Sequence, residues 1–283
     1  MIMSSIFQDQ VVWITGASSG IGEAMAKDFV SRGAKVILTA RRADRLEKIA
    51  GELNAVSLGS AKILPADLSN LEVLPELTAR ALKSFGHIDV LFNNAGVSQR
   101  SQVIDTPFEI EHLMIKLDLL SPIALTKAIL PHFLARKSGR ILVTSSLMGD
   151  LEVPGSATYS CVKHGLNGYF YSMAFEVAAL GILVQVIQPG FVKTEVSEKS
   201  FTSDGSLYGK KDSTQARAMS AEQFSKRVFP KIERGDSSIY ISGAEGYAVY
   251  LKRFSPPLYR LIISKFAKKL LKDRLSHIEN KAE

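Results

Sequence analysis

The residues that could carry out chemistry are a tyrosine and a lysine four positions apart, Tyr159 and Lys163, and Ser146 ahead of them. On a helix, residues i and i+4 lie on one face, one turn apart. A lysine ammonium in that place favours the phenolate form of the tyrosine, which can then exchange a proton near neutral pH. A serine hydroxyl from a nearby loop could hold a substrate oxygen while charge develops on it. The three residues indicate proton transfer on an alcohol or a carbonyl, although a tyrosine–lysine pair alone is more often surface decoration.

A glycine-rich segment near the N-terminus predicts a phosphate-binding turn. The apolar run 11–14 is typical of a buried parallel strand, and residues 23–30 begin a helix. Between them, Gly16, Gly20 and Gly22 permit a tight turn and a close backbone approach to a ligand. The helix N-terminus would offer free N–H groups and a positive dipole end to a pyrophosphate. The spacing differs from the standard Gly-x-Gly-x-x-Gly pattern, and a glycine-rich turn without a ligand is the alternative.

The end of the next predicted strand, residues 35–40, favours NADP(H) over NAD(H). In a dinucleotide-binding fold an acidic residue near this point binds the ribose 2′-hydroxyl, whereas an arginine accommodates a 2′-phosphate. Ala40 stands where the acid is expected, and Arg41 and Arg42 follow it. Asp44 is better explained as the N-terminal charge or cap of the next helix. The alternative for the two arginines is a solvated turn.

Five motifs in order resemble those of the short-chain dehydrogenase/reductase family over roughly residues 8–245. They are Thr15-Gly16-x-x-x-Gly20-x-Gly22, Asn93-Asn94-Ala95-Gly96, Ser146, Tyr159-x-x-x-Lys163 and Pro189-Gly190. The segments 94–101 and 125–132 resemble more narrowly the dehydrogenase/reductase member-seven branch. Its members are linked to carbonyl reduction on lipophilic substrates such as steroids and retinoids. The resemblance implies an NADP(H)-dependent oxidoreductase acting on a hydrophobic ketone or aldehyde, or on the corresponding alcohol.

The resemblance also implies individual roles. Tyr159 would be the general acid in reduction and the base in oxidation, Lys163 would favour its phenolate and hold the nicotinamide ribose, and Ser146 would polarise the substrate carbonyl. Asp67 would contact the adenine ring. The cofactor cleft would be lined by Gly16, Ser18, Ser19, Gly20, Ile21, Gly22, Arg41, Asp67, Leu68, Asn94, Ala95, Gly96, Tyr159, Lys163, Pro189, Gly190, Val192 and Thr194. The hydride chemistry belongs to the nicotinamide, and the protein supplies orientation and electrostatics.

One position departs from the family pattern. Members usually carry an asparagine in the helix before the serine strand, where it completes a water-linked proton relay to the lysine, and this chain has Asp118 there. If the main-chain carbonyl carries the water contact, the change is tolerated. A carboxylate close to Lys163 could instead bind the ammonium and weaken its effect on Tyr159. A non-catalytic NADPH-binding regulator or scaffold is therefore the alternative function.

The composition fits a single enzyme domain. The chain has 283 residues, 46% of them hydrophobic and 22% charged, which is ordinary for a globular protein. Strand and helix patterns alternate through the first 190 residues and predict a Rossmann-like, doubly wound parallel sheet in three layers. Its ligands are expected at the carboxyl ends of the strands. The helices near 107–136 and 159–180 are expected, by resemblance, to form a homodimer or homotetramer.

Localisation and metal content follow from smaller signals. No apolar run reaches the ~18 residues that span a membrane, and the N-terminus lacks the features of a signal peptide. The lone cysteine, Cys161, excludes an internal disulfide and favours the cytoplasm. The five histidines show no spacing typical of metal ligands, so we expect no metal site.

The C-terminal third divides into a loop region and a basic extension. We predict an NADP-binding domain over residues 1–250, whose segment 191–235 is the substrate-loop region, and an extension over 251–283. Residues 252–283 carry nine Lys or Arg and three Asp or Glu, so 9 − 3 = +6 of the net +7 lies there. Charge confined to one tail argues against nucleic-acid binding. Leu258, Leu261, Ile262, Lys265, Phe266, Lys269 and Leu270 recur at helical steps. This stripe predicts either packing on the body or peripheral contact with an anionic membrane.

Overall fold

The computed structural model describes residues 5–195, 200–202 and 218–282, so residues 196–199 and 203–217 of the predicted substrate-loop region 191–235 lie outside them. Seven strands form one sheet in the order β3-β2-β1-β4-β5-β6-β9, with every neighbouring pair parallel. The strands are β1 (Val11–Thr15), β2 (Lys35–Thr39), β3 (Ala61–Ile63), β4 (Val90–Asn93), β5 (Gly139–Thr144), β6 (Ile182–Pro189) and β9 (Ser238–Ile241). The strand order reverses between β1 and β4, where such sheets bind ligands.

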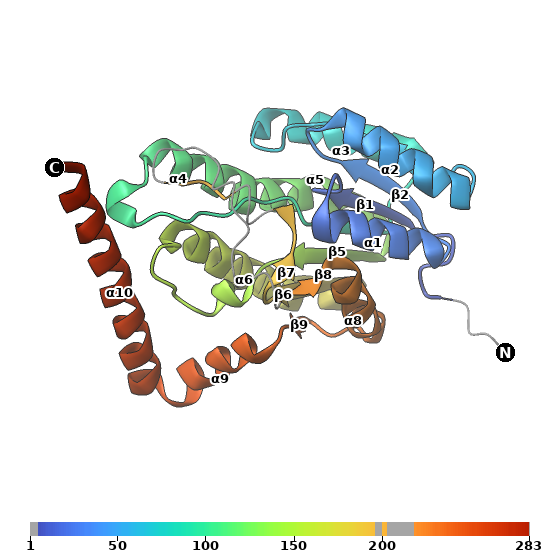
Figure 1. The fold of residues 1–283 in the computed structure, drawn as a ribbon. Helices are drawn as coiled ribbons and strands as arrows, with labels where there is room; N and C mark the ends of the chain where they lie inside the picture. The colour runs from blue at the N-terminus through green and yellow to red at the C-terminus, as the bar shows by residue number, and fades with distance from the viewer. Residues whose placement is uncertain (1–4, 196–199, 203–217, 283) are drawn as a thin grey trace.

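Helices cover both faces of the sheet (Figure 1). One layer contains α1 (Gly20–Ser31), α2 (Ala43–Val56) and α8 (Ala221–Arg234), and the other contains α3 (Leu74–Phe85), α5 (Ser121–Arg136) and α6 (Ala157–Val177). Side chains alternate along each strand, so Ile14 packs in the first layer and Trp13 in the second. The predicted three-layer parallel fold is confirmed.

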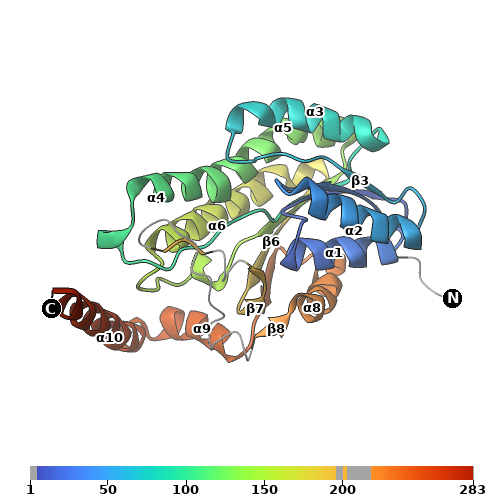
Figure 2. The same ribbon diagram turned by 45° about the horizontal axis from the view of Figure 1, so that its top comes forward.

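The remaining elements are shorter or lie at the edge. A pair of two-residue strands, β7 (Val192–Lys193) and β8 (Met219–Ser220), forms beside the main sheet. Helix α4 (Phe108–Ile115) continues through a π-helical turn (Lys116–Leu120) into α5. Among the described residues, 3₁₀ turns occur at Leu71–Val73, Val103–Asp105, Leu147–Gly149, Ala178–Leu180 and Ala244–Gly246. Figure 2 shows α4 and α6 extending beyond the sheet.

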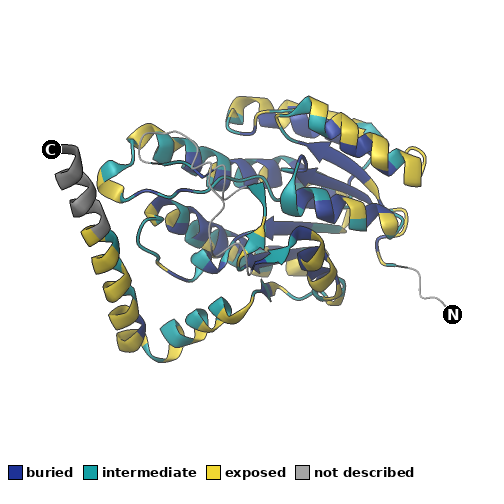
Figure 3. Ribbon diagram, in the orientation of Figure 1, coloured by how far each residue is buried: buried dark blue, intermediate teal, exposed yellow. Residues whose placement is uncertain are grey.

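Two helices follow the last sheet strand and leave the body of the domain. They are α9 (Tyr247–Phe254) and α10 (Pro256–Ala282). The break between them falls at Ser255, and Pro256 begins the second helix, where its missing N–H costs nothing. Figure 3 shows α10 exposed along most of its described length. In the part of the chain that the structure describes, every helix is too short or too polar to cross a bilayer.

Three local features are the starts of helices α8 and α2 and the exposed side of α10, and the last two were the subject of sequence predictions. Helix α8 begins at Ala221, and Ser220 and Gln223 form a capping box at its start. Asp44 lies in the first turn of α2, but Arg42 occupies the cap position, so only the charge role remains. Two alternatives were predicted for the tail stripe, and the exposure of its residues contradicts the first, packing on the body. Tyr259 is the buried residue of the first turns of α10, and Leu258 and Ile262 are exposed.

Candidate active site

The three catalytic candidates meet at the carboxyl end of β5. Ser146 follows this strand directly, and its Oγ accepts a hydrogen bond from the Met148 N–H at 3.1 Å. Tyr159 and Lys163 lie one turn apart on α6. The Lys163 Nζ lies 5.4 Å from the centre of the Tyr159 ring and donates to the Thr144 carbonyl at 3.2 Å. Lys163 is buried, while Ser146 and Tyr159 remain half-buried. The cation is therefore held in the interior, next to the half-buried ring of Tyr159 and the strand end that Ser146 follows.

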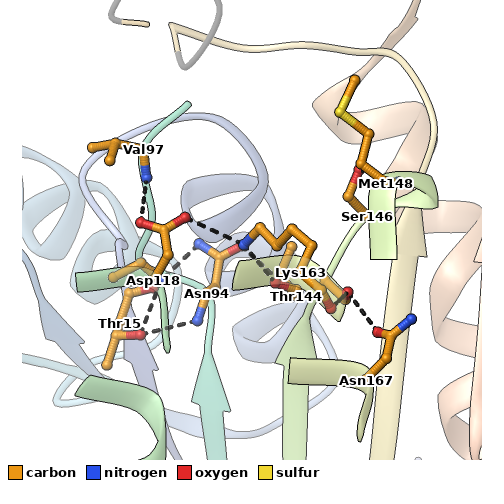
Figure 4. Close-up of polar contacts among 11 residues, drawn as sticks. Thr15, Asn94, Val97, Asp118, Thr144, Ser146, Met148, Lys163 and Asn167 are labelled. Carbon is orange, nitrogen blue, oxygen red and sulfur yellow. Dashed lines mark hydrogen bonds and ion pairs between the residues drawn. The ribbon is translucent and has the colours of Figure 1, made fainter. Parts of the chain in front are cut away.

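Asp118 is part of the same cluster. Its Oδ2 lies 3.4 Å from the Lys163 Nζ, and its Oδ1 accepts a hydrogen bond from the Val97 N–H at 2.9 Å (Figure 4). The side chain is fully buried, and this burial raises the pKa of Asp118 although Lys163 and Val97 act in the opposite direction. A Cβ at Gly96 would lie 2.8 Å from the Asp118 Oδ2, so a side chain there would force the carboxyl to shift. Of the two outcomes expected for Asp118, the structure has the carboxyl beside the ammonium.

The position of Asp118 depends on the π-helical turn between α4 and α5. One extra residue in such a turn shifts the side chains of the following helix relative to a regular α-helix. Asp118 lies in the middle of that turn and is directed toward α6 and the end of β4. The turn therefore brings a residue from one layer of helices against the lysine of the neighbouring helix.

Asn94 connects the ends of three neighbouring strands. Its Nδ2 donates to the Thr15 carbonyl at 3.2 Å, and its Oδ1 accepts from the Thr144 hydroxyl at 3.0 Å. The Thr15 hydroxyl in turn accepts the N–H of Asn94 at 2.9 Å and that of Ala95 at 3.1 Å. The side chain of Asn94 is thus used to hold the ends of β1, β4 and β5 together, and it frames the predicted cofactor cleft.

The loop that contains Gly16, Gly20 and Gly22 is sharply turned and closely packed. Gly16 and Gly20 have φ values of 66° and 59°, in the left-handed region that glycine tolerates. A Cβ at Gly22 would collide with the Gly16 carbonyl, and one at Gly20 would lie 2.9 Å from the Thr194 side chain. These contacts bring the segment after β6 against the loop at the N-terminus of α1. The free N–H groups of this helix end suit an anionic group.

The two arginines after β2 occupy different positions. Arg42 donates to the Ser18 hydroxyl at 3.1 Å and to the Ser19 hydroxyl at 3.0 Å, and it forms an ion pair with Glu195 at 3.1 Å. Arg41, the predicted phosphate ligand, is exposed. Arg42 is therefore a candidate that the site prediction missed. The Arg41-Arg42 dipeptide was its sequence signal, but the sequence offers no reason to prefer one over the other.

The predicted adenine end lies beside a surface hollow. Asp67 accepts hydrogen bonds from the N–H of Ser69 at 3.0 Å and from its hydroxyl at 2.8 Å. Burial opposes ionisation, yet these bonds and the nearby Arg41 hold the pKa of Asp67 below its usual value. Pro65, Ala66, Asp67 and Asn70 line the hollow together with residues of α3. Leu68 is buried in the core, so its side chain does not reach the cleft.

The predicted nicotinamide end follows β6. The Gly190 N–H donates to the Ile241 carbonyl at 2.9 Å, and a Cβ at Gly190 would collide with Glu245. Glu245 also accepts the Phe191 N–H at 3.1 Å. Burial opposes ionisation of this carboxyl, but hydrogen bonds from Gly243 and Phe191 hold its pKa below the usual value. Pro189 and Gly190 thus turn the chain from the sheet toward Thr194 and the glycine loop.

Comparisons with known proteins agree with this geometry. Residues 10–205 match the family model described as short chain dehydrogenase. The chain is a member of the short-chain dehydrogenase/reductase family. A Drosophila melanogaster protein named Dehydrogenase/reductase SDR family protein 7-like is 38% identical over 265 residues, which cover 92% of this chain and 81% of that protein. The predicted resemblance to the family and to its member-seven branch is confirmed, and the protein is an oxidoreductase.

Two solved structures of the family show the same fold. A metagenomic short-chain oxidoreductase in complex with NADP is 29% identical, with a TM-score of 0.70 over 84% of this chain and 99% of its own. A Burkholderia phymatum short-chain dehydrogenase/reductase in complex with NAD is 21% identical, with a TM-score of 0.77 over 89% and 95%. The family therefore uses nicotinamide cofactors of both kinds, and the choice in this chain depends on its own residues.

Sequence reasoning also missed the polar residues that support the family site. The Thr144 hydroxyl donates to the Asn94 side chain at 3.0 Å, and the Ser145 hydroxyl donates to the Asn167 side chain at 2.6 Å, with the Lys163 carbonyl 3.3 Å away. Each lies next to a motif or on its helix, but a serine or threonine at a strand end has no sequence pattern of its own. Its role becomes visible only when the strands are placed side by side.

Proposed function

We propose that the protein is an NADP(H)-dependent oxidoreductase that interconverts a carbonyl and an alcohol, with Tyr159 as the acid or base. The observation that supports this most is the common position of Ser146, Tyr159 and the buried Lys163 at the carboxyl end of β5. This is the edge of the sheet where the glycine loop also lies. Small and polar groups gather there around a cleft that suits an extended dinucleotide.

The residues present fit a nicotinamide dinucleotide. The backbone of the glycine loop leaves no room for side chains at Gly16 and Gly22, and the N-terminus of α1 can accept a pyrophosphate. Arg41 and Arg42 supply positive charge at the end of β2, and Ala40 stands in the usual place of the ribose-binding acid. Their charge suits a 2′-phosphate and supports NADP(H) as the cofactor. When bound, the cofactor supplies or accepts the hydride.

The proton moves through Tyr159. In reduction, the Ser146 hydroxyl holds the substrate oxygen by a hydrogen bond, and the Tyr159 hydroxyl gives it a proton as negative charge develops there. The buried Lys163 ammonium stabilises the phenolate that remains. In oxidation the same phenolate removes the proton from the alcohol. Asp118, 3.4 Å from the ammonium, offsets part of its charge when ionised.

A hydrophobic ketone or aldehyde is the proposed substrate, on the strength of the member-seven resemblance. Leu147 and Leu151, close after Ser146 in the chain, are buried against α9 and α10. Met148 and Val153 in the same segment are half-buried and stay available. A panel of ketones and aldehydes with NADPH consumption as the readout tests the function. No consumption with any of them, by a folded protein that binds NADPH, would count against it.

NADPH binding without turnover would instead indicate the second candidate function, an NADPH-binding regulator. The buried contact between Asp118 and Lys163 favours it, because an ionised carboxyl there weakens the support for the phenolate. Comparing turnover of the parent and of Asp118→Asn separates the two functions. An enzyme turns over in both forms, whereas a regulator gains turnover only when the carboxyl is removed, or not at all.

We also propose a cytoplasmic enzyme that self-associates through the faces of α4, α5 and α6. Phe108 and Phe175 on these helices are 71% and 87% exposed, unusually so for phenylalanine. A second copy would cover them. Light scattering at micromolar concentration should show a dimer or a tetramer, and a monomer would contradict this part of the proposal.

A further inference from the structure

Helices α9 and α10 expose a series of large apolar side chains on the side away from the body, which we call their outer face. On α9, Tyr247, Tyr250 and Phe254 follow one another at three- and four-residue steps and are 75%, 59% and 77% exposed. On α10, Leu258, Ile262 and Phe266 continue at four-residue steps, each more than 40% exposed. We call these six residues the apolar row. Large exposed apolar surfaces mark places where a protein contacts something else.

The same two helices carry charge of one sign. Residues 247–272 contain seven Lys or Arg and no Asp or Glu. Lys252 binds Glu152 and the Asp150 carbonyl of the body. The other six are exposed: Arg253, Arg260, Lys265, Lys268, Lys269 and Lys272. We call them the basic set. Both helices therefore expose large apolar side chains and cations.

The inner face of these helices is already occupied. Tyr259 is 6% exposed, and its hydroxyl donates to the Glu152 carbonyl at 2.8 Å. Val249, Leu251 and Ile263 pack around the cluster of Leu147, Leu151 and Tyr259. The apolar row therefore does not serve to attach α9 and α10 to the domain, because a different line of residues does so.

We propose that the outer face of α9 and α10 binds the surface of an anionic membrane. Aromatic rings with one polar end favour the headgroup level, and long lysine side chains can extend from an apolar helix face to the phosphates. Each Lys or Arg near an anionic leaflet adds to the attraction. A second copy on this face would set the basic sets of the two chains against each other. Nucleic acid would satisfy the charge but leave the apolar row in water.

Helices α9 and α10 pack close to the candidate active site. Leu147 and Leu151, on which α9 and α10 pack, follow Ser146 closely along the chain. A membrane bound to the outer face would be separated from the segment that follows the serine by one helix diameter, about 10 Å. If the proposed function holds, on which this step rests, the arrangement would allow a lipophilic substrate to enter from the bilayer. Membrane binding itself does not depend on that function.

Vesicle sedimentation of the full chain tests the proposal. A truncation at Ser255 would also remove the packed Tyr259 and Ile263, so substitutions are sharper. One variant changes Lys265, Lys268, Lys269 and Lys272 to Gln, and a second carries Tyr250→Ser and Phe254→Ser. The control changes the exposed Lys48, Lys83, Lys127 and Lys226, elsewhere on the surface, to Gln. All four proteins are compared on phosphatidylcholine vesicles with and without phosphatidylserine at low salt.

We expect the parent and the control to bind the phosphatidylserine vesicles at least about tenfold more tightly than either test variant. Parent binding should weaken with added salt and on vesicles of phosphatidylcholine alone. Absence of parent binding overturns the proposal, and so does an equal loss in the control. So does a dimer that dissociates on Phe254→Ser without vesicle binding, because a second copy would then cover the face. Thermal melting and NADPH titration of each variant show that fold and cofactor binding are retained, separately from any failure of turnover.

Discussion

The strand-end cluster around Lys163 and the helices α9 and α10 are built in opposite ways. In the first, polar groups lie inside the protein: Asp118 and Lys163 are at most 4% exposed, and Asn94 joins three strands. In the second, Tyr247, Phe254 and other apolar groups lie outside, on helices held by a few contacts. Buried polar groups are costly unless they are paired, and exposed apolar groups are unfavourable unless something covers them.

The difference lies in where the interaction partners of each region are found. Most polar groups of the cluster have hydrogen-bond partners within the chain, although Asp118 Oδ2 has only the ion pair with Lys163. The hydroxyls of Ser146 and Tyr159 point to a small ligand. The outer face of α9 and α10 has no such neighbours among the described residues, and its chemistry points to a partner outside the chain. Changes in the first region should therefore alter catalysis and cofactor choice, whereas changes in the second should leave both unaffected.

The largest effect is expected at Tyr159. Tyr159→Phe removes the hydroxyl that gives and takes the proton but keeps the ring beside Lys163. Turnover of an authentic substrate should fall at least about 10²-fold, the lower range for a positioned acid or base, while NADPH binding is retained. Tyr169→Phe, on the same helix, is the matched control and should stay near the parent rate. A Tyr159→Phe variant as fast as the parent would remove the proposed role.

The two arginines after β2 should decide the cofactor. NADPH should bind at least about tenfold more tightly than NADH, because one charge-assisted phosphate contact contributes roughly 1.5–3 kcal/mol. Arg41→Ala and Arg42→Ala, measured separately by fluorescence titration, show which arginine carries the preference. Arg45→Ala, on the following helix, should preserve it. Equal affinities of the parent for both cofactors would contradict the assignment.

The sequence was sufficient for the fold and for the residues that meet at the strand ends. Alternating strands and helices dictate a parallel sheet, and strand ends of such a sheet share one edge, so the Thr15, Asn93 and Ser146 regions could be brought together in advance. The sequence could not choose between Arg41 and Arg42, since successive residues at a strand end point in different directions. It also could not decide between packing and membrane contact for the stripe on α10, because the line that begins at Leu258 and the buried line through Tyr259 are equally helical. Which line faces the body depends on the shape of the body.

Two substitutions in α9 and α10 should have effects of intermediate size on the free energy of unfolding. Tyr259→Phe removes a buried hydrogen bond to the Glu152 carbonyl and should lower the free energy of unfolding by about 1 kcal/mol. Phe254→Ser, at a residue that is 77% exposed, should change it by no more than about 0.5 kcal/mol. Urea unfolding of both variants measures the difference. A larger cost for Phe254→Ser would mean that the row supports the fold and is not a free surface.

The smallest effect on turnover is expected from Asp118→Asn, which restores the residue that the family usually carries. The amide oxygen of the introduced asparagine can still accept the Val97 N–H, and Lys163 loses only a carboxyl at 3.4 Å, so turnover should stay level or rise. A large fall would show that the carboxyl has a catalytic or structural duty of its own.

The same substitution should be more visible in the pH dependence of stability. Burial raises the pKa of Asp118 in the folded chain above its ordinary value of 3.8, so the folded state binds this proton more readily than the unfolded state. Stability from this group is therefore present at low pH and is lost as the pH rises through the folded pKa. Asparagine cannot titrate, so the Tm of the variant minus that of the parent should become more positive between about pH 4 and about pH 8. A difference that becomes more negative would mean that Lys163 stabilises the carboxylate more than burial destabilises it, and that the pair works as an ion pair in the resting enzyme.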